Sequence, residues 1–114
     1  MELSLPFPPT VNTYYGCSGK GRKFIREKGI AYRNEVLSHV KGLGVHEYTV
    51  PLVVYITLNY PDNRKRDLDN YMKALLDALT HAGLWEDDSL IHQLHIFKGE
   101  IINNGSVDLK VAEL

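Results

Sequence analysis

The stretch Asn63-Arg-Lys-Arg-Asp-Leu-Asp-Asn70 decides much of this fold, and it also carries the most chemical information. It places a basic triplet, Arg64 to Arg66, directly before two carboxylates, Asp67 and Asp69. Apolar side chains then recur at helical spacing, which predicts a helix from Leu68 to Ala82 with one face in the core. That apolar stripe consists of Leu68, Tyr71, Met72, Leu75, Leu76 and Leu79.

Two interpretations of the acids compete. Asp67 alone is well placed to cap the helix, because a carboxylate there accepts from free N–H groups and meets the positive end of the helix dipole. A divalent metal site is the alternative, since hard cations bind carboxylate oxygens and leave other positions to water and phosphate. A cap needs neither Asp69, nor Asn70, nor the basic triplet, whereas a metal-dependent phosphodiester site uses them all. We therefore predict a metal site of Asp67 and Asp69, completed by Asp88, with the adjacent Asp87 as an additional candidate ligand.

Composition indicates one ordinary globular domain over residues 1–114. Hydrophobic residues make up 44% and charged residues 24%, and the net charge is −1, so any signal for nucleic acid must be local. The single cysteine, Cys17, has no internal partner for a disulfide, which fits a reducing cytoplasm. We find no signal peptide and no membrane-length apolar run, and expect no membrane partner.

Apolar periodicity predicts the remaining elements. We expect strands at residues 2–7, 52–60, 90–102 and 107–111, and a hairpin turn at Asn103-Asn104-Gly105. The third strand alternates imperfectly, which predicts either a bulge or burial on both faces. A further helix is expected from Glu27 to Lys41, with Ile30, Val36, Leu37 and Val40 on its apolar side. The order β-α-β-α-β-β predicts an α+β fold, a small mixed sheet with two helices in a two-layer sandwich.

Residues 10–23 are predicted to form a loop, because glycines break any period there. This loop and its exit are basic, with Lys20, Arg22, Lys23, Arg26 and Lys28 against only Glu27. A solvated surface loop and a phosphate-binding segment explain these charges equally well. Tyr14 and Tyr15 are open to two interpretations as well, stacking on bases or burial at a strand end.

The chain resembles the RusA family of Holliday junction resolvases, found in bacteria and often carried by phages and prophages. The resemblance spans nearly the whole chain and depends on several motifs in one order and spacing. They are Leu5-Pro-Phe-Pro-Pro-Thr-Val-Asn12, Tyr14-Tyr15, Ala31-Tyr-Arg33, Arg66-Asp-Leu-Asp-Asn70, Lys73, Asp77-Ala-Leu79 and Gly83-Leu-Trp-Glu-Asp-Asp88.

This resemblance implies a RusA-like fold and a homodimeric, magnesium-dependent endodeoxyribonuclease, with manganese as a substitute metal. Such an enzyme binds four-way DNA junctions and nicks two opposed strands symmetrically, in DNA recombination and repair, in the cytoplasm of a bacterium or a phage-infected cell. The resemblance also implies that Asp67, Asp69 and Asp88 are the catalytic and metal-binding acids, and that Lys73 is a catalytic lysine. The DNA-contacting segments would be residues 10–13 and 63–70, with Thr10, Asn12, Thr13, Asn63, Arg64, Lys65, Arg66 and Asn70.

Two points about this site depend on simple geometry. Lys73 either steadies charge at the reacting phosphate or forms an ordinary ion pair with Asp69 or Asp77. A helix over residues 68–82 is about 22 Å long, whereas the extended segment 84–88 reaches at most about 17 Å. Asp88 therefore joins the acids of its own chain only if the chain folds back along the helix, and otherwise it serves the partner's site. We favour the same-chain site, because Gly83 permits a sharp reversal.

Two other functions deserve comparison with this one. A non-catalytic branched-DNA-binding module would use the acids only as caps, and magnesium-dependent cleavage of a junction distinguishes it from a nuclease. A zinc site is disfavoured, since the odd spacing of His92 and His95 places them on opposite faces of a strand and Cys17 has no suitably spaced partner.

Overall fold

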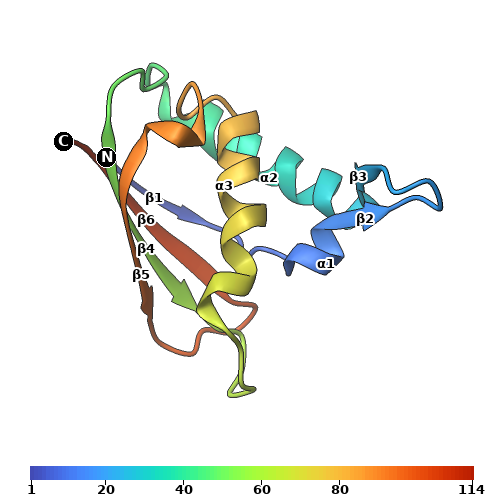
Figure 1. Cartoon of the computed structure of the whole chain (residues 1–114). Helices are drawn as coiled ribbons and strands as arrows, with labels where there is room; N and C mark the ends of the chain where they lie inside the picture. Colours follow the sequence, from blue (N-terminus) through green and yellow to red (C-terminus); the bar gives the residue numbers. More distant parts are fainter.

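The computed structural model describes residues 1–114 and shows a four-stranded mixed sheet with the two longer helices on one face (Figure 1). The strand order is β1-β6-β4-β5, with β1 at Glu2–Leu5, β6 at Ser106–Glu113, β4 at Leu52–Asn59 and β5 at Ile91–Lys98. β4 pairs antiparallel with β6 and parallel with β5, while β1 pairs antiparallel with β6. The predicted α+β fold with a mixed sheet is confirmed.

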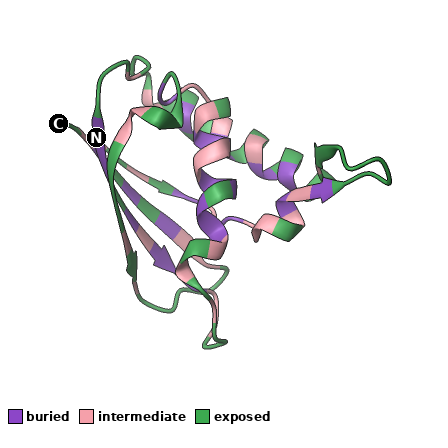
Figure 2. Cartoon of the chain, in the orientation of Figure 1, coloured by how far each residue is buried: buried purple, intermediate pink, exposed green.

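The core lies between the sheet and the helices, as the alternation in the sequence predicts. In β4 the side chains of Leu52, Val54, Ile56 and Leu58 are fully buried, and Leu109 of β6 is buried beside them. Figure 2 shows buried segments in purple on the central strands and along the helices. Each such aliphatic side chain contributes roughly 1.5–3 kcal/mol by leaving water.

The central helix is shorter and less regular than predicted. A 3₁₀ turn, η1, occupies Leu68–Tyr71, and the α-helix α3 runs from Met72–His81. The predicted stripe does face the core, joined there by Ala74 and Ala78. After α3, Gly83 has φ of 79°, and the Leu84 N–H donates to the Leu79 carbonyl, which closes the helix and reverses the chain.

The helix α2, at Glu27–Leu43, confirms the second helix prediction but not all of its apolar face. Ile30 is 51% exposed, because the buried positions are Gly29, Tyr32, Val36 and Val40. Gly29 lies so close to its neighbours that a Cβ there would be 2.7 Å from the Tyr14 carbonyl oxygen. The glycine is therefore required by close packing, although it has a low helix propensity.

The prediction of a loop over residues 10–23 is wrong. This segment forms a single helical turn, α1, at Val11–Tyr14, and most of a hairpin of β2, Tyr15–Cys17, with β3, Lys23–Ile25. Thr10 caps α1 by accepting from the Thr13 N–H at 3.3 Å. Tyr14 is fully buried, so of its two interpretations the structure supports burial and not stacking on bases. Elements this short leave no detectable period in the sequence.

The turn at Asn103–Gly105 forms, with positive φ at both Asn104 and Gly105, but the predicted hairpin does not. β5 lies on the other side of β4 and runs parallel to it, so the turn joins strands that are not neighbours. β5 ends at Lys98 rather than near residue 102. Its predicted irregularity is confirmed, since Ile91 pairs with Leu52 and Gln93 with Val53, which leaves His92 as an extra residue.

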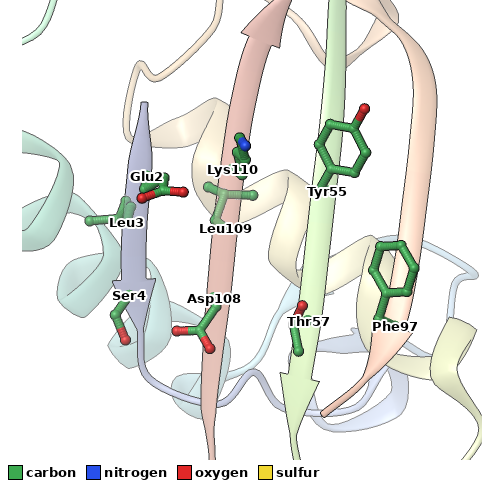
Figure 3. A pocket seen from close by; sticks show the side chains of 9 residues that line it. All are labelled: Glu2, Leu3, Ser4, Tyr55, Thr57, Phe97, Asp108, Leu109 and Lys110. Atoms are coloured by element: carbon green, nitrogen blue, oxygen red, sulfur yellow. The ribbon is translucent and has the colours of Figure 1, made fainter.

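The second face of the sheet is not covered by helices. It has a hollow of about 600 Å³, and Figure 3 shows the side chains of Tyr55, Thr57 and Phe97 on the neighbouring strands β4 and β5 there. His95 stacks on Tyr55 with ring centroids 4.9 Å apart. None of the predicted site acids lines this hollow. No helix in the chain has the length and hydropathy needed to cross a bilayer.

Candidate active site

The loop between β4 and η1 is held by a single carboxylate. Asp62 accepts from the backbone N–H and the guanidinium of Arg64, and it forms an ion pair with Arg66 at 2.6 Å. The hydrogen bonds from Arg66, and to a smaller extent those from Arg64, hold the pKa of Asp62 well below its usual range. The side chain of Arg66 is only 12% exposed. Two members of the basic triplet therefore share one acid, while Lys65 forms no ion pair.

Asp67 and Asp69 follow this loop and are both exposed. Asp67 occupies the N-cap position of η1, but its side chain makes no capping hydrogen bond. The capping interpretation of Asp67 is therefore wrong. Neither carboxylate takes part in an ion pair within the chain. Both are thus available to an external cation, and their oxygen donors are those that Mg²⁺ prefers.

The two later acids, Asp87 and Asp88, have different structural roles. Asp87 caps the 3₁₀ turn η2, Asp88–Leu90, by accepting from the Ser89 N–H at 3.0 Å. Hydrogen bonding from the Ser89 side chain, and next from this N–H, lowers the pKa of Asp87. Asp88 is exposed and forms no ion pair. Of the two, Asp88 is therefore the acid that is free to bind a metal.

The chain does not bring Asp88 to Asp67 and Asp69. Because β5 runs parallel to β4 and Ile91 pairs with Leu52, Asp88 lies near the start of β4, whereas Asp67 follows its end. Eight residues of strand separate these positions by about 23 Å. In Figure 1 the orange turn after α3 and the yellow-green loop before it lie at opposite ends of that helix.

The favoured same-chain metal site is accordingly not formed by this fold. No group of three or more His, Cys, Asp or Glu side chains lies close enough to hold a metal ion. Gly83 does reverse the chain, but Leu84 and Glu86 then form hydrogen bonds with the backbone of Tyr48. The fully buried Trp85 donates to the Thr80 hydroxyl at 2.7 Å and fixes this course. The segment therefore enters β5 without returning along α3.

Lys73 lies in the first turn of α3, where it is exposed and forms no ion pair with Asp69 or Asp77. The ordinary ion-pair interpretation of Lys73 is wrong. Its Nζ lies 5.4 Å from the centroid of the Tyr15 ring, within the range of a cation–π contact. A groove of about 390 Å³ opens beside it, lined by Val11, Asn12, Tyr15, Gly16, Cys17, Lys23, Arg26 and Lys73.

Arg26 shapes this groove from the hairpin side. Its Nε donates to the carbonyl oxygens of Asn12 and Tyr15, at 3.1 and 2.9 Å, and so fixes α1 against β3. The groove thus places three cations, Lys23, Arg26 and Lys73, around its opening. Basic side chains around such an opening favour an anionic ligand such as a phosphate.

A polar network behind the groove joins three helices. Tyr14 and Arg33 both donate to the Asp77 carboxylate, Arg33 at 2.6 Å, and Arg33 also donates to the Tyr14 hydroxyl at 2.7 Å. Burial alone would raise the pKa of Asp77, but the hydrogen bonds from Tyr14 and Arg33 outweigh it and lower the pKa. Burial, reinforced by the bond to Asp77, raises the pKa of Tyr14. Sequence reasoning assigned no role to this network.

The other predicted DNA-contacting residues fall in two neighbouring regions. Thr10 lines a hollow of about 360 Å³ with the basic triplet, so the two predicted segments do approach each other. Thr13 is largely occupied, since its hydroxyl accepts from that of Thr10 at 2.9 Å. The remaining candidates are at least partly accessible on the hairpin, α1, the loop or η1: Lys20, Arg22, Lys23, Asn12, Asn63 and Asn70.

Exposed carboxylates without internal partners, close to unpaired lysines, are the groups that a hard cation and a phosphodiester can bind. The family model described as endodeoxyribonuclease RusA matches residues 6–111. This chain belongs to the RusA family of endodeoxyribonucleases.

Its relatives resemble it over nearly their whole length. The crossover junction endodeoxyribonucleases of Enterobacteria phage HK97 and Enterobacteria phage 82 are each 37% identical to it. The protein of that name from Escherichia coli strain K12 is 35% identical. In all three comparisons the match covers 99% of this chain and 94% of the relative.

Proposed function

We propose that this protein is a magnesium-dependent, structure-specific endodeoxyribonuclease that resolves four-way DNA junctions by paired symmetric nicks. The observation that carries the proposal is the match to the RusA family over residues 6–111, in a chain whose Asp67, Asp69 and Asp88 are exposed and unpaired. The names of its relatives point to crossover junctions as substrates. A role in DNA recombination and repair is part of our proposal. Such DNA would be met in the cytoplasm of a bacterium or an infected host cell.

The residues of the chain have distinct tasks in this proposal. Asp67 and Asp69 hold the cation, and Lys73 supplies a positive charge that no carboxylate of the chain offsets. Mg²⁺ held by these acids, or Mn²⁺ in its place, would supply a nucleophile from water at neutral pH and would offset charge on the leaving oxygen. The cations of the hairpin and the loop hold the phosphates on either side of the cut.

The position of Asp88 supports a homodimer with shared sites. Because one chain separates Asp88 from Asp67 and Asp69 along the length of β4, a second copy has to provide the third acid. A twofold axis then generates two equivalent sites, each composed of acids from both chains. Two such sites can face two opposed strands of a junction, which accounts for paired and symmetric cutting.

Cleavage of a synthetic four-way junction, with and without Mg²⁺, tests this function. We expect nicks in two opposed strands only when the metal is present. Asp69→Asn keeps the size of the side chain but removes its charge, so this variant should bind the junction and no longer cut it. Glu113→Gln, at the exposed end of β6, is the matched control and should cut normally. Undiminished cutting by Asp69→Asn would contradict the role of Asp69.

A non-catalytic branched-DNA-binding module remains the alternative, and the same assay identifies it. Such a module would bind the junction with equal affinity in the wild-type and Asp69→Asn forms and would cut at no metal concentration.

A further inference from the structure

Lys98 is the last residue of β5, and the sheet directs it toward the candidate site. It pairs in register with Leu58, which is fully buried on the helix-covered face. Side chains alternate along a strand, so Lys98 shares this face with Ile96, while Phe97 occupies the open face of the sheet. Lys98 therefore belongs to the side of the sheet that carries the loop before α3, although it is distant from that loop in sequence.

Tyr60 provides the support on which Lys98 lies. The Lys98 Nζ is 5.7 Å from the centroid of the Tyr60 ring, and the Arg66 guanidinium carbon is 5.5 Å from the same centroid. Tyr60 is only 2% exposed and packs edge-on against Phe7, so the ring is a fixed surface. Both cations are thus placed by an aromatic ring within the known range of cation–π contacts.

The pocket formed in this way is lined entirely by charged side chains. It has a volume of about 490 Å³ and is lined by Lys65, Arg66, Asp67 and Lys98. Its lining has three cations and one carboxylate, and no apolar residue contributes to it. An apolar ligand has nothing to bind there, and the excess of positive over negative side chains favours an anion.

The three cations of this pocket are not equivalent. Arg66 is bound to Asp62 by two hydrogen bonds, of 2.6 and 3.1 Å, and is therefore already paired. Lys65 and Lys98 have no carboxylate partner and are exposed. Two unpaired ammonium groups in one pocket with a paired arginine form a site for an anion of moderate size, such as the phosphate of a nucleic-acid backbone.

We propose that Lys98 and Lys65 form a binding site for one backbone phosphate of the DNA strand whose cleaved bond lies at Asp67. This inference rests on the proposed function and adds to it the phosphate next to the one that is cut. Lys98 is a binding residue that positions the strand relative to the acids. The hydroxyl of Tyr60 is buried and has no hydrogen-bond partner within the chain.

The salt dependence of junction binding tests the proposal without any cleavage. Wild-type protein and variants are titrated against a labelled four-way junction in EDTA at increasing KCl concentration. The logarithm of the association constant falls with log[KCl], and we expect Lys98→Ala to make this slope less steep by about one unit. The Lys65→Ala, Lys98→Ala double variant should make it less steep by about two units. Lys98→Arg, which keeps the charge, should retain the wild-type slope. Lys110→Ala, on the open face of the sheet, is the matched control and should not change it.

Lysine acylation followed by mass spectrometry provides an independent measurement. Bound junction DNA should protect Lys65 and Lys98 from the reagent and leave Lys110 reactive. A wild-type slope in Lys98→Ala, together with unprotected Lys98, would overturn the proposed phosphate site while junction binding itself persists. If the wild-type protein does not bind the junction at all, the proposed function fails, and this site fails with it.

Discussion

The guanidinium of Arg33 and the carboxylate of Asp77 form an ion pair of 2.6 Å that joins α2 to α3. Tyr14 donates its hydroxyl to the same carboxylate, and the next residue, Tyr15, carries the ring beneath Lys73. Both partners of the ion pair are mostly shielded from solvent, with side-chain exposures of 23% and 31%. This contact therefore sets the position of the groove relative to the start of α3.

Loss of the Asp77 charge should destabilise the fold. Asp77→Asn keeps the shape of the side chain but weakens the charge-assisted hydrogen bonds from Arg33 and Tyr14. We expect the free energy of unfolding to fall by about 1–3 kcal/mol, measured by urea denaturation. Glu113→Gln, an exposed acid outside any network, should change it by less than about 0.5 kcal/mol. Equal effects of the two substitutions would contradict the importance of this contact.

The same pair predicts a dependence of stability on pH. The pKa of Asp77 is lower in the folded chain than the usual unfolded value of about 3.9. Its contribution is therefore complete above that unfolded value and is lost as the pH falls through the folded pKa. The difference in unfolding free energy between wild type and Asp77→Asn should shrink as the pH is lowered below about 4. Asp62 and Asp87 are present in both proteins, so their effects largely cancel, and a difference that stays constant with pH would rule out this linkage.

Shared sites in a dimer can be tested by mixing two inactive variants. Asp69→Asn and Asp88→Asn are combined so that subunits exchange, and junction nicking is measured. In a mixed dimer with shared sites, one site loses both acids and the other regains a complete set, so nicking of one strand should recover. If exchange is verified and no nicking returns, each site takes all of its acids from one chain.

Two glycines of the same helix should respond in opposite ways to alanine. At Gly29 the added methyl group would lie 2.7 Å from the Tyr14 carbonyl oxygen, so we expect a loss of about 1–3 kcal/mol in unfolding free energy. At Gly42 no atom lies within 4 Å of such a group, and we expect a gain of about 0.4–1 kcal/mol. Thermal or urea unfolding measures both, and a destabilised Gly42→Ala would refute the packing argument.

The sequence predicted those parts of the fold that depend on local patterns. The alternation in β4 and the stripe of α3 were sufficient, because burial on one face leaves a period of two or of about 3.6 residues. The segment around Tyr14 was missed, because its burial depends on Arg33 and Asp77, which are distant in sequence. Turn chemistry at Asn104 and Gly105 was correct, but a turn does not determine which strand becomes the neighbour.

The candidate site shows the same division between local and distant effects. The motif around Asp67 and Asp69 and the later Asp88 predicted which acids form the site, and the structure leaves all three exposed without ion-pair partners. The relative positions of these acids could not be predicted, since they depend on β5 running parallel to β4. Lys98 was missed for a related reason, because only the register with Leu58 directs it toward the loop.

The extra residue at His92 has a consequence for how this chain behaves at high concentration. β5 is an outer strand of the sheet, and its unpaired backbone groups offer a template to which another extended chain can add. The bulge interrupts the regular row of those groups near the start of the strand, and Lys98 places a charge at its end. Both features disfavour the addition of a further strand to β5 and the growth of fibres. We therefore expect copies of this chain to associate through surfaces other than the outer edge of β5.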